Sequence, residues 1–197
     1  MILYLTFSPR GEPSFSRRMG DELVGRLGGP AVTRDLANDP PPWIDAGFSA
    51  AILAPPTPEV PPSLTVSETL IRELEAADRL VIATPMHNFG VPAPLKAWVD
   101  QVVRINRTFH STPEGKIGLL RDIPAYLVVA SGGWFTGPSP AGTPAQPDFL
   151  TGYMRTVLET VGIRSLHIIA MEGVTRGPEM ADRAVAGARA AIGRLLG

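Results

Sequence analysis

Hydrophobic residues follow two different spacings along this chain, and segments with the two spacings alternate. Nearly continuous apolar runs indicate buried strands at residues 1–7, 31–36, 79–84, 124–130 and 163–170. Between these runs, apolar residues recur every three or four positions and predict amphipathic helices that begin near residues 14, 65, 92, 148 and 177. The pattern is most regular from Pro92 to Arg107, which is expected to be helical throughout.

This alternation predicts one α/β domain over residues 1–197, with a five-stranded parallel sheet covered by helices on both faces. A sheet of this size favours the flavodoxin-like, doubly wound strand order 2-1-3-4-5. In that order strands 1, 3 and 4 are neighbours, and ligands bind outside the carboxyl ends of the strands. The loops that leave those ends, at 8–16, 85–91 and 131–147, are therefore the expected site.

A proline-rich stretch at about 38–62 interrupts the alternation. It holds eight of the chain's 21 prolines together with Trp43 and Phe48, which predicts a long surface excursion rather than a packed element. The helix after it begins with Thr65-x-x-Glu68, the pattern of a capping box in which each side chain bonds a backbone N–H group.

Two later helices also carry terminal signals in the sequence. Asp148 can cap the helix near residue 148, and Gly162 can end it. Gly177-Pro178 is a typical opening for the last helix, because proline is well accommodated at the first helical position.

The charge balance argues against a polyanionic partner. Lys and Arg total 18 against 19 Asp and Glu, so no basic surface for nucleic acid or an anionic membrane is expected. The absence of cysteine excludes disulfides, a thiolate nucleophile and cysteine metal ligands, and no metal site is expected. Residues 1–7 lack the features of a signal peptide and no apolar run could span a bilayer, so a cytoplasmic protein with a small-molecule partner is expected.

The first loop carries three hydroxyl groups directly before a helix, at Ser8, Ser14 and Ser16. Free N–H groups and the dipole at a helix start favour a phosphate dianion, and Arg10 can add a charged contact. Alternatively, Ser14 or Ser16 is an ordinary N-cap and Ser8 a turn residue. The loop matches neither G-x-G-x-x-G nor G-x-x-x-x-G-K-[ST], so a single terminal phosphate suits it better than a dinucleotide or a nucleoside triphosphate.

The other two loops combine stiff backbone with aromatic side chains. Pro85-Met86-His87-Asn88-Phe89-Gly90-Val91-Pro92 has prolines at both ends and can present backbone groups to a flat ligand at a fixed height. Ser131-Gly132-Gly133-Trp134-Phe135 places two glycines where a backbone could approach a planar ring, beside two aromatics for stacking. The glycines could equally mark a turn, and Trp134 could cover the sheet edge.

Together these motifs resemble the FMN-dependent NADH-azoreductase family of flavodoxin-like quinone reductases. The resemblance covers nearly the whole chain and rests on the hydroxyl spacing and on Met86-x-Asn88-Phe89, Leu95-Lys96, Thr108-Phe109, Gly132-Gly133, Glu172-Gly173 and Gly177-Pro178-Glu179-Met180. Two features depart from the family pattern. His87 stands where the family has tyrosine, and the family's Ser-Arg-Gly-Gly appears as Ala130-Ser131-Gly132-Gly133 or as a one-residue deletion.

The resemblance implies a role for each loop. The three serines would hold the phosphate of a tightly bound FMN, residues 86–89 would line one edge of the flavin ring with Pro85 also in contact with the cofactor, and residues 131–133 would approach its other polar edge. His87 could contact a substrate oxygen or tune the flavin, although a lone loop histidine is more often solvated. The candidates for apolar walls of the substrate pocket are Phe109, Trp134 and Phe135, for which ordinary core or interface packing is the alternative.

The resemblance also implies a reaction and an assembly. NADH or NADPH would pass a hydride to flavin N5 and leave, and a quinone or azo compound would then take two electrons in a ping-pong cycle. A homodimer with its active sites near the subunit boundary is expected. Two alternatives share the fold: an electron carrier that docks on protein partners, and a ligand-binding domain without flavin.

Overall fold

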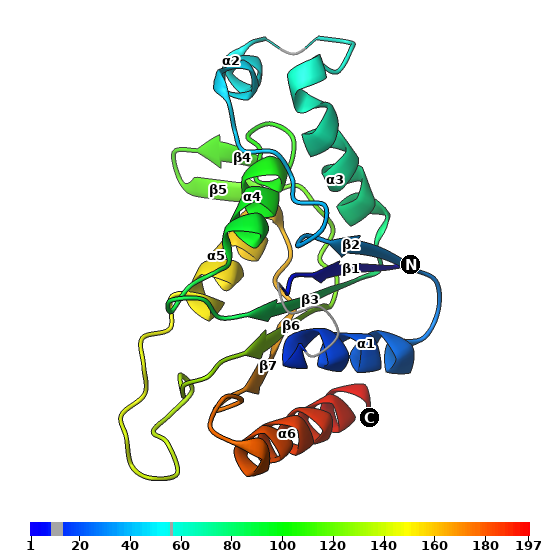
Figure 1. Ribbon diagram of the computed structural model, residues 1–197. Helices are drawn as coiled ribbons and strands as arrows, with labels where there is room; N and C mark the ends of the chain where they lie inside the picture. The colour runs from blue at the N-terminus through cyan, green and yellow to red at the C-terminus, as the bar shows by residue number, and fades with distance from the viewer. Residues whose placement is uncertain (9–13, 56) are drawn as a thin grey trace.

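The computed structural model describes residues 1–8, 14–55 and 57–197, and a parallel sheet forms its centre (Figure 1). The sheet consists of β1 (Ile2–Thr6), β2 (Ala31–Asp35), β3 (Arg79–Pro85), β6 (Ala125–Ala130) and β7 (Leu166–Met171). The predicted α/β class and the five-stranded parallel sheet are confirmed. The strand order reads β2-β1-β3-β6-β7 because an unpredicted antiparallel hairpin, β4 (Phe109–Thr112) and β5 (Gly115–Gly118), precedes β6.

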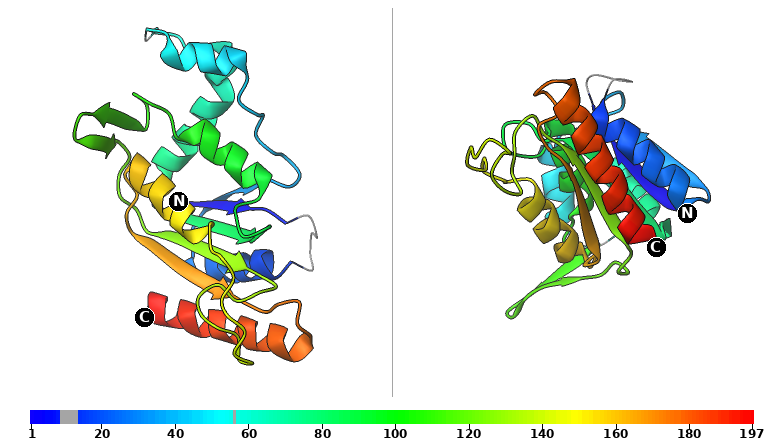
Figure 2. Two further views of the ribbon diagram at one scale, coloured as in Figure 1. Left: turned by 90° about the vertical axis from the view of Figure 1, so that its left-hand side faces the viewer. Right: turned by 90° about the horizontal axis from the view of Figure 1, so that it is seen from below.

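Helices lie on both faces of the sheet (Figures 1 and 2). They are α1 (Phe15–Leu27) and α6 (Pro178–Leu196) on one face, and α3 (Thr65–Ala76), α4 (Ala93–Val102) and α5 (Thr151–Val161) on the other. In β1, Leu3 and Leu5 belong to the core under α3, α4 and α5, whereas Ile2 and Tyr4 belong to the core under α1 and α6. Successive strand side chains point to opposite faces, so a strand buried on both faces is apolar throughout.

The proline-rich excursion contains a packed element, contrary to the sequence expectation. Helix α2 (Ala46–Leu53) begins after Asp45, whose carboxylate accepts a hydrogen bond of 2.7 Å from the N–H of Phe48. The side chain of Phe48 is buried, while Trp43 stays exposed. A short 3-10 turn, η1 (Pro62–Leu64), then leads into α3. Proline content obscured this helix, although the local signal of an Asp three residues before a buried Phe was present.

The predicted capping box at the start of α3 is wrong. Leu64 occupies the N-cap position, and no side chain caps the helix. The carboxylate of Glu68 bonds instead to the guanidinium groups of Arg104 and Arg107. A charged hydrogen bond to arginine is stronger than one to a backbone N–H, so the tertiary partners displaced the local one.

Helix α4 ends at Val102, five residues before the predicted end at Arg107. The hydroxyl of Thr108 explains the stop, because it donates to the carbonyl of Val102 at 2.7 Å and accepts from the N–H of Arg104 at 2.9 Å. These bonds replace those that another helical turn would have made.

At α5 the N-cap position falls on Leu150 rather than on the predicted Asp148, while the predicted end of α5 and the predicted start of α6 are confirmed. The carboxylate of Asp148 accepts hydrogen bonds from the N–H groups of Leu150 and Thr151, both at 2.9 Å, at the start of α5. Gly162 ends that helix with a φ of 113°, and Gly177 and Pro178 open α6. Within residues 1–8, 14–55 and 57–197, no helix combines the length and apolarity needed to cross a bilayer.

Candidate functional site

Four neighbouring strands of the sheet end at one edge, and the loops that follow them form the candidate site. Backbone hydrogen bonds continue the sheet ladder just past the strand ends: Phe7 N–H donates to Ala83 at 3.1 Å, and Met86 N–H donates to Ala130 at 2.9 Å. Ser131 N–H likewise donates to Met171 at 2.8 Å. The loops after β1, β3, β6 and β7 therefore leave the sheet at one level.

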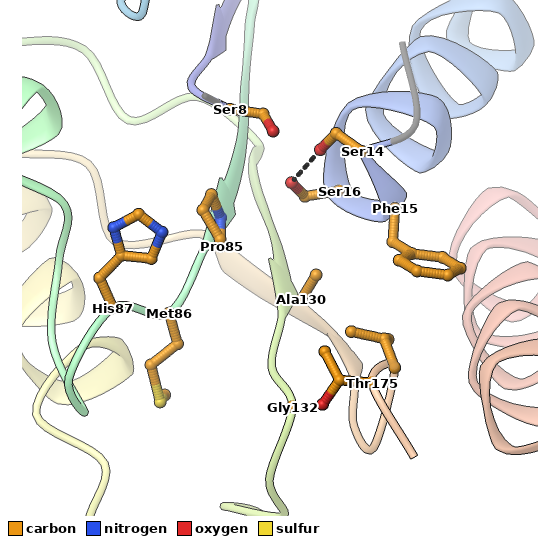
Figure 3. A pocket seen from close by; sticks show the side chains of 11 residues that line it. Ser8, Ser14, Phe15, Ser16, Pro85, Met86, His87, Ala130, Gly132 and Thr175 are labelled. Atoms are coloured by element: carbon orange, nitrogen blue, oxygen red, sulfur yellow. Dashed lines mark hydrogen bonds between the residues drawn. The ribbon is translucent and has the colours of Figure 1, made fainter. Parts of the chain in front are cut away.

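A pocket lies between these loops and the start of α1 (Figure 3). Its volume of about 170 Å³ is below the roughly 300 Å³ at which small-molecule pockets begin, so a larger ligand would extend beyond it. The predicted cofactor residues that line it are Ser8, Ser14, Ser16, Pro85, Met86, His87 and Gly132. The sequence therefore identified residues from three separate loops that share one cavity.

The hydroxyl groups gather on one side of the pocket (Figure 3). Ser14 and Ser16 are only 5% and 1% exposed, and their Oγ atoms lie 3.2 Å apart. Ser14 is also the N-cap of α1, since its Oγ accepts from the N–H of Arg17 at 3.3 Å. The N-cap and the pocket-lining interpretations of Ser14 are therefore compatible. Ser8 is also buried, and Arg10 lies outside the described residues.

Close packing against the sheet fixes the position of α1. A Cβ atom on Gly20 would lie 2.5 Å from the hydroxyl oxygen of Tyr4, so only glycine lets the helix approach β1 this closely. The Tyr4 hydroxyl donates to the carbonyl of Arg17 at 3.2 Å, and Arg17 pairs with Asp35 of β2 at 2.9 Å. Burial, with Asp21 nearby, raises the pKa of Tyr4, which keeps this hydroxyl a neutral donor. The hydroxyl cluster is thus held on a rigid helix.

The loop after β3 makes a tight two-residue turn. His87 and Gly90 exchange backbone hydrogen bonds of 3.1 and 2.9 Å, and the residues between them, Asn88 and Phe89, have φ angles of 46° and 70°. Left-handed backbone is costly for a bulky residue such as Phe89, and strain of this kind gathers at functional sites. In the described part of the chain, nothing accepts a hydrogen bond from the N–H groups of Asn88 and Phe89. Within the described residues both N–H groups are therefore available to a ligand, although Asn88 and Phe89 do not line the pocket itself.

His87 lies at the mouth of the pocket and is exposed. Its ring meets the edge of Phe7, with centroids 5.8 Å apart and planes at 79°. The ring is therefore oriented by an aromatic contact while its nitrogens can still reach a ligand.

Gln146 joins the loops after β3 and β6. Its side-chain amide lies 3.2 Å from the sulfur of Met86 and 3.1 Å from the hydroxyl of Ser131. A Cβ atom on Gly133 would lie 2.1 Å from Gln146 Oε1, so glycine at 133 leaves room for the Gln146 side chain. The predicted contacts Ser131 and Gly133 thus serve packing here and do not line the pocket.

A fourth loop, after β7, was missed by the sequence analysis. Val174 and Thr175 line the pocket, and the N–H of Val174 donates to the carbonyl of Ser131 at 3.1 Å. The carboxylate of Glu172 accepts hydrogen bonds from the N–H of Phe135 and from both the N–H and the hydroxyl of Thr136. The rule that selected the first three loops, position after a parallel strand, would also have selected this one.

The three aromatic residues predicted as substrate walls have separate locations. Trp134 lines a second pocket beside the first. Phe135 is buried in the core with α4 and α5, which is the packing alternative. Phe109 lies in the β4–β5 hairpin beneath the ammonium group of Lys116, 5.2 Å from the ring centroid. Within this chain, the structure does not bring these rings together.

The pocket offers neutral polar groups. Among the residues that the structure describes, none of those lining it is Asp, Glu, Lys or Arg. Hydroxyls can donate to an anion or accept from a donor by rotating, and the start of α1 adds its dipole. The arrangement can bind a phosphate-bearing ligand and orient an attached group toward the loops after β3 and β6.

Comparison with known proteins identifies the family. Residues 1–196 match a family model described as a flavodoxin-like fold. The FMN-dependent NADH:quinone oxidoreductase 2 of Cupriavidus pinatubonensis is 47% identical over 92% of this chain and 90% of that protein. The chain belongs to the FMN-dependent NADH:quinone oxidoreductase family. A Pseudomonas fluorescens member, FMN-dependent NADH:quinone oxidoreductase 4, is 44% identical over 97% of this chain and 93% of that protein.

Solved structures agree on the fold of this family member. An azoreductase from Bacillus anthracis superposes with a TM-score of 0.81 at 21% identity, over 99% of this chain and 97% of that one. An FMN-dependent NADH-azoreductase from the same species, in complex with FMN, gives a TM-score of 0.78 at 22% identity, over 100% and 99% of the two chains. At such identities the similarity supports the architecture alone.

Proposed function

We propose that this chain is an FMN-dependent NAD(P)H oxidoreductase that reduces quinones or azo compounds by two-electron, ping-pong transfer. The buried Ser14–Ser16 hydroxyl pair at the start of α1 carries the proposal, because it places phosphate-binding groups inside a pocket at the carboxyl edge of the sheet. This assignment takes the sheet as doubly wound, so that its ligand crevice lies outside the ends of β1 and β3. The relatives named for FMN-dependent NADH:quinone oxidoreduction support it.

The residues present suit FMN. Ser8, Ser14 and Ser16 would bind the phosphate. The N–H groups of Asn88 and Phe89, which have no acceptor among the described residues, would bind a polar edge of the ring where it extends beyond the pocket. FMN, when bound, supplies the hydride chemistry at its N5 atom. The protein then orients the ring and excludes water, and His87 can donate a hydrogen bond to a substrate oxygen at the pocket mouth.

We propose further that two chains form a homodimer next to this site. Phe149 is 68% exposed, Phe89 is 45% exposed, and the N–H of Phe149 donates to the carbonyl of Phe89 at 2.9 Å. Exposed aromatics that adjoin a pocket are typical of an interface. Phe149→Asp should convert the dimer to a monomer in light scattering, whereas Glu159→Gln on an exposed face should not.

An absorbance experiment tests the function directly. The purified chain is mixed with excess FMN, desalted, and treated anaerobically with NADH or with NADPH. We expect the flavin absorbance bands to be retained, to bleach when NADH or NADPH reduces the flavin, and to return when a quinone or an azo dye reoxidises it. Flavin that is retained and not reduced would favour an electron carrier, and no retained flavin would refute the proposal.

A further inference from the structure

A second pocket lies beside the first, between residues 133–146 and the start of α6, the segments after β6 and β7 in Figure 1. Its volume of about 580 Å³ falls within the range of small-molecule sites. Gly132 and Thr175 line the first pocket, whereas the next residues, Gly133 and Arg176, line the second. The two pockets are therefore lined by consecutive residues of the same two loops.

We propose that this second pocket binds an anionic group carried on a flat ring system, with Arg176 as the anion contact and Trp134 as the stacking surface. The inference rests on the proposed function for its biological role, since it assigns the pocket to an electron donor or acceptor of the flavin site. The geometry of the pocket itself is independent of that function.

Arg176 is positioned to receive an anion. Its Nε donates to the carbonyl of Gly132 at 3.3 Å, and its guanidinium carbon lies 5.9 Å from the centroid of the Trp134 ring. It is the one charged side chain among the described residues that line this pocket. A guanidinium held over an aromatic ring can still use its other N–H donors to bind a carboxylate, sulfonate or phosphate.

The acidic residues on either side of Arg176 are engaged elsewhere. Glu172 accepts hydrogen bonds from the backbone of Phe135 and Thr136, and Glu179 pairs with Arg183 at 2.7 Å. Across the described parts of the chain, no carboxylate forms an ion pair with Arg176. Among the residues that the structure describes, its charge therefore has no carboxylate partner.

Trp134 is held firmly enough to act as a stacking surface. Its ring packs against Gly173, where an added Cβ atom would lie 2.8 Å from Cζ2, and its carbonyl accepts from the N–H of Gln146 at 2.7 Å. The other described residues that line the pocket are uncharged, and Pro140, Pro144 and Met180 among them are apolar. A flat apolar body with one anionic substituent suits this lining.

Two ligands of the proposed reaction share this chemistry. One is the nicotinamide dinucleotide, through its phosphates, and the other is an aromatic acceptor with a sulfonate or carboxylate group. Arg176→Gln tests both, with Arg183→Gln in α6, the helix that follows Arg176, as the matched control for loss of one positive charge. KM values of the FMN-loaded protein would be measured for NADH, NADPH, 1,4-naphthoquinone and 1,4-naphthoquinone-2-sulfonate.

We expect Arg176→Gln to raise KM about tenfold for an anionic ligand, equivalent to about 1.4 kcal/mol, and less than twofold for uncharged naphthoquinone. An effect on the sulfonate alone identifies an acceptor site. An effect on NADPH alone identifies its 2′-phosphate, and an effect on both dinucleotides identifies the pyrophosphate. Unchanged KM for every anion, or an equal rise for the uncharged quinone, would overturn the inference.

A binding measurement separates this inference from the proposed function. Naphthalene-2-sulfonate would be titrated calorimetrically into the purified chain before FMN is added. We expect binding that weakens about tenfold in Arg176→Gln and is unchanged in Arg183→Gln. If the sulfonate binds in this way but FMN is not bound or not reduced, only the proposed function is refuted. If FMN is bound and reduced but Arg176→Gln binds the sulfonate as tightly as the native chain does, the assignment of the second pocket as an anion site is wrong.

Discussion

The pocket at the sheet edge and the cluster of charges beside α3 use polar groups in opposite ways. The cluster, defined as Glu68, Glu75, Arg104 and Arg107, joins α3 to the segment after α4. Arg104 and Arg107 lie 2.8 and 2.9 Å from the carboxylate of Glu68, which is 8% exposed. The pocket, in contrast, contains hydroxyl groups, and its described lining has no ion pair.

The difference separates a structural from a binding use of polarity. Buried charges stabilise a fold only when they are fully paired, and groups that are paired in this way have no hydrogen-bonding capacity left for a ligand. Hydroxyl groups cost less to bury, and each can rotate to donate to an incoming phosphate. Changes in the cluster should therefore alter stability without affecting flavin binding, and changes in the pocket should do the reverse.

The largest expected effect is on the stability of the cluster in acid. Hydrogen bonds from Arg107, and then Arg104, lower the pKa of Glu68 to about 2 from an ordinary value of 4.5. Because the folded pKa is the lower one, the stabilisation is complete above pH 4.5 and is lost as the pH falls toward 2. We expect it to contribute about 3 kcal/mol to the free energy of unfolding.

Denaturant unfolding of Glu68→Gln at several pH values measures this contribution. The variant should be less stable than the native chain at pH 7 and approach it near pH 2, with FMN affinity unchanged. Glu159→Gln, at an exposed glutamate with no ion pair within the described residues, serves as the control. A constant stability gap between pH 7 and pH 3 would contradict the pKa assignment.

The next effect concerns the hydroxyl pair of the pocket. Ser14→Ala combined with Ser16→Ala should weaken FMN binding about 100-fold, because two charge-assisted hydrogen bonds to phosphate contribute roughly 1.5 kcal/mol each. Loss of the Ser14 N-cap should cost only about 1 kcal/mol of stability. Fluorescence titration of FMN and thermal unfolding measure the two quantities.

Ser14→Asp separates the cap from the phosphate contact. Aspartate caps a helix as well as serine does, but its charge repels a phosphate dianion. This variant should keep the helix cap and lose FMN. Ser49→Ala, which removes an exposed hydroxyl bonded to the carbonyl of Asp45, is the matched control. Unchanged FMN affinity in the double alanine variant would refute the phosphate assignment.

The smallest of these effects should come from a residue that does not line the pocket but holds one of its loops in position. Glu172 holds the backbone of Phe135 and Thr136, so Glu172→Ala should loosen the loop after β6 and weaken FMN binding about tenfold. Glu172→Gln keeps an acceptor and should restore most of the affinity. Hydrogen exchange of the amides at 133–136 provides the second readout. Protection of those amides that is equal in all three proteins would exclude this positioning role.

Local patterns were sufficient for the parts of this protein that are formed by local contacts. Ser14, Gly162 and Pro178 mark helix ends through backbone interactions within one turn, and the structure confirms all three. The three serines and residues 85–87 were found because parallel strands place their carboxyl ends at one edge. The capping box failed because Glu68 bonds to arginines more than 30 residues away, which no local pattern contains.

By itself, therefore, the sequence determined the strands, most helices and the hydroxyl half of the pocket, since apolar periodicity and capping act over a few residues. Only the tertiary structure decided that Ser131 and Gly133 pack against Gln146, and that Thr175 enters the pocket. It also placed Arg176 beside Trp134, from loops that are 42 positions apart in the chain. Such contacts depend on the order of strands in the sheet, which sets which distant loops become neighbours.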